Sequence, residues 1–236
     1  TLTEGFTIVV FVLIFCFKES GHTGIYALSL QDALPIASSS GPGLQESRAR
    51  GVMALLEVLP FPAPRLKRVS EPIEEITDAL RQLAVDMCEV MYDEPGIGLA
   101  APQVGKNVRL IVVDTEWGEE GKERDATVVV NPEISEPEGK LVWEEGCLSV
   151  PDFVADVTRA ERILIRGTSL DGEPIEIRAE GLQSVCFQHE VDHLDGILFI
   201  DRLSRLKRGL YVKRRKKQLA LEDEEGEPVD TRASRL

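Results

Sequence analysis

The chain has 236 residues, a formal net charge of −14 at pH 7 and 43% hydrophobic residues. The apolar fraction is sufficient for a folded core, whereas the acidic balance argues against direct binding of DNA, because phosphate recognition requires a basic field. The four cysteines stand far apart without a CxxC pair, which excludes the pattern of a disulfide framework or zinc ribbon and favours a reducing cytoplasm.

The N-terminal 1–52 segment differs in pattern from the rest of the chain. Its apolar run at residues 6–17 is shorter than the roughly 20 residues of a membrane helix, and it lacks the positive start of a signal peptide. We therefore expect no membrane segment and interpret residues 1–52 as a non-native or disordered extension. The folded domain is expected to begin near Met53.

Hydrophobic spacing then predicts the elements in order. Apolar residues recur at three- and four-residue steps over residues 76–91, which predicts a helix that stops before Pro95. Residues 108–114, 126–134 and 161–167 are rich in β-branched side chains and predict strands.

Residues 180–196 return to helical spacing and contain the sequence QHEVDH. The strands on the N-terminal side of this helix predict an α+β fold, with short antiparallel sheets packed around it. A run rich in Lys and Arg at residues 202–217 predicts a C-terminal helix, and residues 218–236 are expected to form an acidic flexible tail.

The His-Glu-x-x-His motif predicts a metal site. On a helix, His189 and His193 lie one turn apart on one face, and Glu190 can reach a metal-bound water as general base. Downstream ligands typical of other motif-bearing proteases are missing, since Phe199 stands six residues past the motif and no glutamate occurs between Glu190 and Glu222. Cys147, in EEGCLSVP, is the upstream candidate, although an isolated cysteine is more often a small buried residue.

The glycine-rich segment GIGLAAPQVG at residues 96–105 matches the loose dinucleotide fingerprint G-x-G-x-x-A. That interpretation fails because the segment follows a helix and precedes a strand, the reverse of the dinucleotide-binding order. The glycines better suit a backbone edge that approaches a ligand closely. Gln103 offers an amide donor, but taken alone it is more consistent with a structural role.

GIGLAAPQ, EGCLS and QHEVDH, in this order, closely resemble the three signature motifs of the peptide deformylases, over about residues 53–217. The resemblance implies a metal-dependent hydrolase that removes the formyl group from the initiator methionine of nascent polypeptides. It implies Fe²⁺ as the metal, for which Zn²⁺, Ni²⁺ or Co²⁺ can substitute, bound by Cys147, His189 and His193. The Gln103 amide and the Leu148 backbone N–H would stabilise the developing oxyanion.

The same resemblance extends to the substrate and to possible partners. A peptide would pair with the edge at Gly98. The candidates for the apolar slot that holds its first side chain are Ile97, Trp143, Val185 and Cys186. Glu145 and Arg159 are expected to form a pair that steadies the Cys147 loop. The family also docks on the ribosome through a C-terminal helix, a role that the basic run could serve here.

Two other classes of function stay open at this stage. One is a metalloprotease of different specificity, and the other is a catalytically silent homologue retained as a ribosome-binding module. The absence of a downstream ligand weighs against the protease, and the joint presence of Glu190, Cys147 and Gln103 weighs against the silent homologue.

Overall fold

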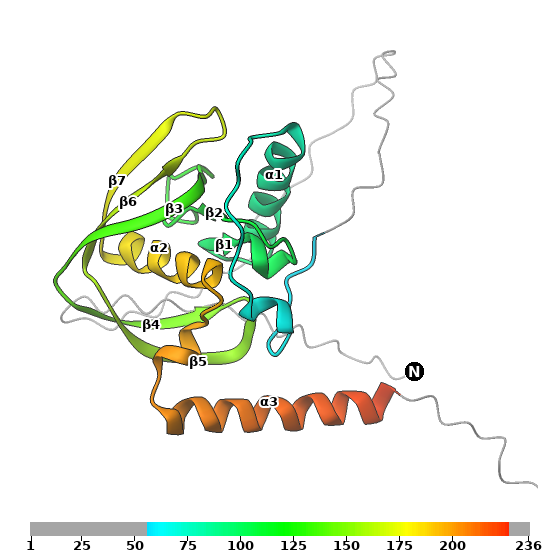
Figure 1. Ribbon diagram of the computed structural model, residues 1–236. Helices are drawn as coiled ribbons and strands as arrows, with labels where there is room; N and C mark the ends of the chain where they lie inside the picture. The colour runs from blue at the N-terminus through cyan, green and yellow to red at the C-terminus, as the bar shows by residue number, and fades with distance from the viewer. Residues whose placement is uncertain (1–55, 227–236) are drawn as a thin grey trace, which may run out of the picture. The chain divides into compact units, whose positions relative to one another are not determined.

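Helix α2 (Gly181–Leu194) lies between two antiparallel sheets (Figure 1). The computed structural model describes residues 56–226, so the expectation for residues 1–52 lies outside the described residues. The arrangement is the predicted α+β fold, with short antiparallel sheets around the helix that carries the His-Glu-x-x-His motif. This prediction is confirmed.

The larger sheet has five strands in the order β1-β2-β3-β6-β7. Their bounds are β1 Gly98–Ala100, β2 Leu110–Val113, β3 Thr127–Glu138, β6 Arg162–Thr168 and β7 Pro174–Glu180. Strands β2, β3 and β6 overlap the three segments expected from their β-branched residues, whereas β1 and β7 were not predicted as strands. The order leaves β1 at one edge of the sheet.

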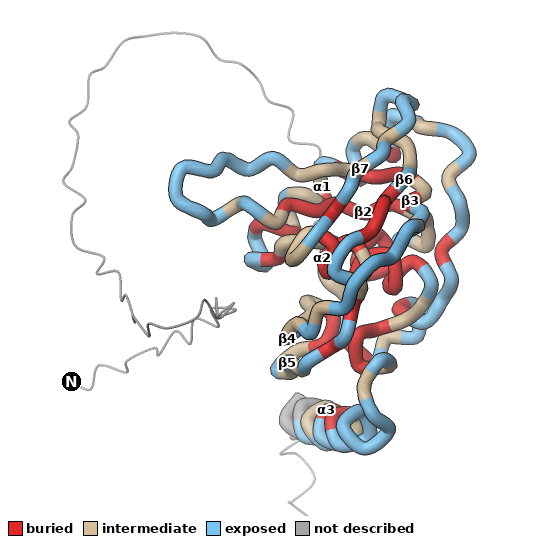
Figure 2. The backbone as a smooth tube through the Cα atoms, turned by 90° about the vertical axis from the view of Figure 1, so that its left-hand side faces the viewer, coloured by how far each residue is buried: buried red, intermediate tan, exposed pale blue. Residues whose placement is uncertain are grey.

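Strand β2 is buried along its whole length because both of its faces are covered (Figure 2). Leu110 and Val112 belong to the core beneath α1 (Asp78–Asp93), while Ile111 and Val113 belong to the core against α2. Alternate side chains of a strand point to opposite faces, so a strand covered on both faces reads as the continuous apolar run LIVV. Helix α1 begins after Thr77, whose side chain accepts a hydrogen bond from the Leu80 N–H.

The second sheet is the hairpin of β4 (Leu141–Cys147) and β5 (Val150–Arg159), which the sequence did not predict. Its alternation is obscured in the sequence because Val142 and Val154 are exposed, whereas the charged Glu145 and Arg159 are buried. Cys147 is therefore the last residue of a strand, where a loop was expected.

Helix α3 (Arg205–Gly226) follows three short 3₁₀ turns along the chain, η1 (Pro64–Lys67), η2 (Ala101–Val104) and η3 (Phe199–Arg202). It buries Tyr211, whose ring lies 4.7 Å from that of Phe153. The helix continues past residue 217 to Gly226, because the QLALEDEE sequence that follows has high helix propensity. Within residues 56–226, no helix is long and apolar enough to cross a membrane.

We predict that Gly167→Ala destabilises the large sheet. A Cβ at Gly167 would lie 2.4 Å from Val129 Cγ1 and 2.8 Å from the Val130 carbonyl oxygen of the neighbouring strand. Such overpacking costs about 1–3 kcal/mol, which a lower midpoint of urea unfolding would reveal. Gly209→Ala is the matched control, because a Cβ there meets nothing within 4 Å and alanine favours a helix. A Gly167→Ala midpoint equal to that of the parent would contradict the packing argument.

Candidate metal centre and active site

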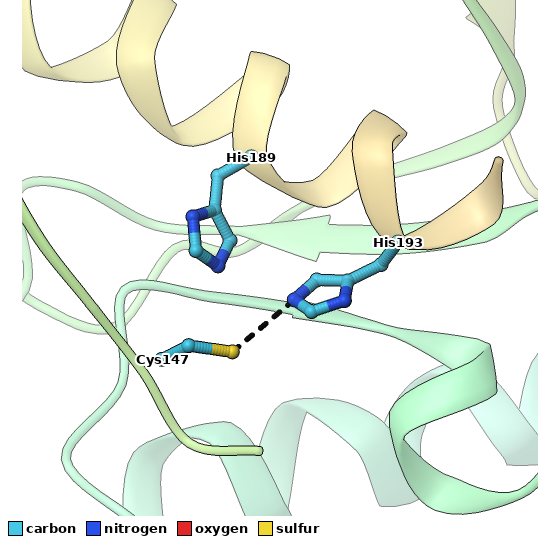
Figure 3. Close-up of side chains that lie close together, drawn as sticks. All are labelled: Cys147, His189 and His193. Carbon is cyan, nitrogen blue, oxygen red and sulfur yellow. Dashed lines mark hydrogen bonds between the residues drawn. The ribbon is translucent and has the colours of Figure 1, made fainter. Parts of the chain in front are cut away.

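Three potential metal ligands converge between α2 and the hairpin. His189 and His193 lie on α2, both side chains are buried, and Cys147 approaches them from the end of β4 (Figure 3). One ligand atom from each of the three lies within 4.8 Å of the others, and Cys147 Sγ is 3.3 Å from His193 Nε2. Among the described residues this is the only group of three or more His, Cys, Asp or Glu side chains so arranged.

The turn of the β4–β5 hairpin places Cys147 beside Gln103. Gln103 Nε2 lies 3.7 Å from Cys147 Sγ and donates to Ser149 Oγ at 3.3 Å, while Gln103 Oε1 accepts a hydrogen bond from the Ala100 N–H at 2.8 Å. The Ala100 contact fixes the amide so that its NH₂ group faces the thiol side of the site. Gln103 is fully buried, and no motif singled out its neighbour Ser149.

Glu145 orients His189. Its Oε2 lies 2.8 Å from His189 Nδ1, an arrangement in which the ring N–H donates to the carboxylate and leaves Nε2 available as a ligand. Arg159 forms a bidentate pair with the same carboxylate, through Nε at 2.6 Å and Nη2 at 2.8 Å. Burial alone would raise the pKa of Glu145, but hydrogen bonds from Arg159 and His189 lower it to about 2. The expected contact between Glu145 and Arg159 is thus present.

Asp192 is a further buried acid of the site that sequence reasoning missed. Its Oδ2 accepts a hydrogen bond from Arg159 Nη1 at 2.6 Å. The available signal was its position three residues after His189, inside the motif and on a helix buried on most sides. An acid at such a position needs a cationic partner.

Glu190 follows His189 on α2, and one of its carboxylate oxygens has no hydrogen-bond partner among the described residues. The side chain is buried, and the oxygen without a partner is Oε2. Burial raises the pKa of Glu190 to about 7. A buried carboxylate with an unpaired oxygen is suited to hold and move a proton.

The expected peptide edge lies against this carboxylate. A Cβ added to Gly98 would stand 2.5 Å from Glu190 Oε1 and 2.7 Å from Cys186 Sγ, so only glycine fits. The Cys186 thiol lies 3.4 Å from the carbonyl oxygen of Ile97, and burial raises its pKa well above the ordinary value. Ile97, Gly98 and Cys186 are therefore brought together.

The remaining slot candidates come from different elements. Val185 is buried on α2 next to Cys186. Trp143 is half-buried on β4, two residues before Glu145 and on the same face of the strand. Leu148, the expected oxyanion donor, is half-buried in the hairpin turn, and its side chain borders Gly96.

The donor set fits a divalent metal. One thiol and two imidazoles suit Zn²⁺ or Fe²⁺. Glu190 Oε2 has no hydrogen-bond partner among the described residues, so it could accept a hydrogen bond from a polar ligand such as a water. Three protein ligands leave one tetrahedral position open, as in catalytic sites.

Comparison with known proteins assigns the family. A family model described as polypeptide deformylase matches residues 55–209. A peptide deformylase of Alkalilimnicola ehrlichii is 54% identical over 156 residues, which cover 66% of this chain and 86% of the relative.

Solved structures agree with the sequence relatives. A peptide deformylase from Legionella pneumophila matches with a TM-score of 0.66 at 40% identity, over 74% of this chain and 100% of its own. One from Synechococcus elongatus, determined in complex with actinonin, has a TM-score of 0.64 at 37% identity, over 68% of this chain and 88% of its own. The chain therefore belongs to the polypeptide deformylase family and is a deformylating hydrolase.

Proposed function

We propose that this chain releases formate from the N-formylmethionine of nascent polypeptides, with Cys147, His189 and His193 as the metal ligands and Glu190 as the general base. The observation that carries the proposal is the convergence of three ligand atoms beside a buried carboxylate that has an unpaired oxygen.

The chain's own groups account for each charge that develops. Glu190 takes a proton from the attacking water and returns it to the leaving amine. The Gln103 NH₂ group and the Leu148 N–H donate to the formyl oxygen as it becomes negative. A metal held by the three ligands supplies Lewis acidity, which acidifies the water and withdraws electrons from the formyl carbonyl.

Substrate binding is proposed at the free side of β1. Strand β1 is the edge of the five-stranded sheet, so an extended peptide can add to it at Gly98 through backbone hydrogen bonds. The methionine side chain would enter a slot formed by Ile97, Trp143, Val185 and Cys186, and an unbranched side chain suits such an irregular apolar space. Arg159 is fully committed to Glu145 and Asp192 and so is not available to the peptide.

We propose Fe²⁺ as the native metal, with Zn²⁺, Ni²⁺ or Co²⁺ able to replace it. The mixed thiolate and imidazole set accepts any of these ions. The thiolate also requires a reducing environment, which supports a cytoplasmic location.

Helix α3 is proposed to dock this enzyme near nascent chains on the ribosome. Its inner face is held by Tyr211, whereas most of its Lys and Arg side chains are exposed. A row of exposed cations suits the phosphates of ribosomal RNA. We place the catalytic unit at residues 53–217 and regard the acidic residues beyond it as dispensable for chemistry.

The direct test is to incubate the full-length, metal-loaded chain with formyl-Met-Ala-Ser and to measure formate. Acetyl-Met-Ala-Ser and an unblocked longer peptide serve as the comparison substrates. Formate from the first peptide alone supports the proposal. Cleavage of the longer peptide would instead identify a protease, and no turnover of any peptide would favour a silent homologue.

We predict that Glu190→Gln retains the metal but loses formate release by about 10²- to 10⁴-fold, because an amide cannot accept the proton of the water. The metal content per chain and the rate of formate release should be measured on the same sample. Glu89→Gln, an exposed position on α1, is the matched control. Near-parental turnover by Glu190→Gln would remove Glu190 from the role of base.

Cys147→Ser is expected to bind metal much more weakly, because a hydroxyl ionises poorly and only two imidazoles remain. Metal per chain after anaerobic purification checks this directly, and Cys88→Ser on α1 should keep the parental content. The parent loaded with Fe²⁺ should lose activity in air, whereas the Ni²⁺ form should resist. A serine variant that holds one metal and works like the parent would refute Cys147 as a ligand.

Gly98→Ala should reduce formate release by about 10²-fold, since misplacement by 1 Å has an effect of that order. The new Cβ would displace Glu190 Oε1 and Cys186 Sγ, which lie 2.5 and 2.7 Å from it. Metal content should stay parental because the three ligands are elsewhere. Gly209→Ala is the control for the substitution itself. Parental turnover by Gly98→Ala would show that the edge is looser than described.

A further inference from the structure

A second arginine extends the ion pairs beyond the metal ligands. Arg202, the last residue of η3, donates from Nε to Asp192 Oδ2 and from Nη2 to Asp192 Oδ1. Asp192 Oδ2 also accepts from Arg159 Nη1. The Asp192 side chain is 9% exposed, whereas that of Arg202 is 41% exposed. A continuous chain of contacts therefore runs from the surface to a ligand, in the order Arg202, Asp192, Arg159, Glu145, His189.

We propose that Arg202 is a positioning residue for the metal centre, which acts through Asp192, Arg159 and Glu145 on the orientation of His189. The inference rests on the proposed metal site. Arg202 does not belong to any of the three signature motifs, and its sequence neighbours gave no reason to connect it with the site.

The charges along the chain alternate in sign. Glu145 and Asp192 are anions, Arg159 and Arg202 are cations, and the four groups together are neutral. Without Arg202, the buried part would hold two carboxylates and one guanidinium. That excess negative charge would stand in a region of low dielectric, where an unpaired charge is costly.

The geometry of Arg159 explains how this loss would reach the ligand. Its guanidinium is shared, with Nε and Nη2 on Glu145 and Nη1 on Asp192. With Arg202 present, Asp192 is satisfied from outside and Arg159 can keep its bidentate hold on Glu145. With Arg202 removed, Asp192 would compete for the same guanidinium. Glu145 would then be held less firmly, and so would the His189 ring that donates to it.

Arg202 can be altered without opening the core. Its outer side lines a surface groove together with Asp156, Ile197 and Lys207. Truncation there removes charge and hydrogen bonds but leaves no buried cavity. The variant should therefore fold, which makes the proposal testable in the full-length protein.

The experiment measures the dissociation of Co²⁺ from the loaded full-length chain by competition with a chelator, and the visible absorption of the bound Co²⁺. Arg202→Gln should weaken Co²⁺ binding about 3- to 10-fold, less than the 10- to 100-fold typical of a residue in direct contact with a ligand. The Co²⁺ spectrum should also shift, and Arg202→Lys should recover part of both effects. Arg166→Gln is the matched control, because Arg166 is likewise half-exposed and paired with an acid, Glu176, on the five-stranded sheet.

A double-mutant cycle that combines Arg202→Gln with Glu145→Gln tests whether Arg202 acts on the metal site through Glu145 or only stabilises the fold. If Arg202 acts through Glu145, Arg202→Gln should add little to the effect of Glu145→Gln on Co²⁺ affinity. Parental affinity and spectrum in Arg202→Gln would overturn the proposal, as would an undiminished effect in the Glu145→Gln background. A parent that binds no Co²⁺ would refute the proposed metal site and this inference together, whereas a metal-binding parent with an unaffected Arg202→Gln variant would refute the inference alone.

Discussion

The hydrogen bond between His189 Nδ1 and Glu145 Oε2 joins the central helix to the β4–β5 hairpin, and the geometry of the site depends on it. Glu145 stands two residues before Cys147 on the same strand, so the contact that orients the imidazole also sets where the thiol can lie. Arg159, from the partner strand, holds the carboxylate in place. The helix that carries two of the proposed ligands and the strand that carries the third are thereby fixed to each other.

Burying the polar side chains of α2 costs free energy, and their hydrogen bonds and ion pairs offset that cost. A helix between two sheets is normally apolar on most sides, yet α2 buries His189, Glu190, Asp192 and His193 in consecutive turns. Buried polar groups are tolerated when they are paired. The acid at position 192 is paired with two arginines, whereas Glu190 keeps one oxygen without a partner. Of two acids that are two residues apart, one is thus held in ion pairs and the other is the residue that we propose as general base.

Strand β1 lies at the edge of the five-stranded sheet, next to the proposed site. Gly98 lies on the outermost strand of the large sheet, and its lack of a side chain lets the backbone approach Glu190. The following turn, η2, carries Gln103 back towards the thiol. One short segment therefore carries both the backbone edge at which we propose that a peptide binds and the amide that we propose as donor to the reacting carbonyl, while α1 covers the opposite face of the same sheet.

The sequence by itself determined the features that depend on local spacing. Two histidines four residues apart in a helical pattern must share a face, the apolar runs of β2 and β6 mark buried strands, and three ordered motifs identify the family. From residue patterns alone, Cys147 was one candidate for the third ligand. Only the resemblance to the family implied that it is a ligand. The β4–β5 hairpin was not predicted because Val142 and Val154 are exposed while the charged Glu145 and Arg159 are buried, which obscures the alternation of a strand. Only the tertiary structure decided that Arg159 pairs with Asp192, 33 residues away, and that Asp192 also binds Arg202. Charged side chains carry no periodic signal for their partners, and the choice among many acids and arginines is made by which of them folding buries together.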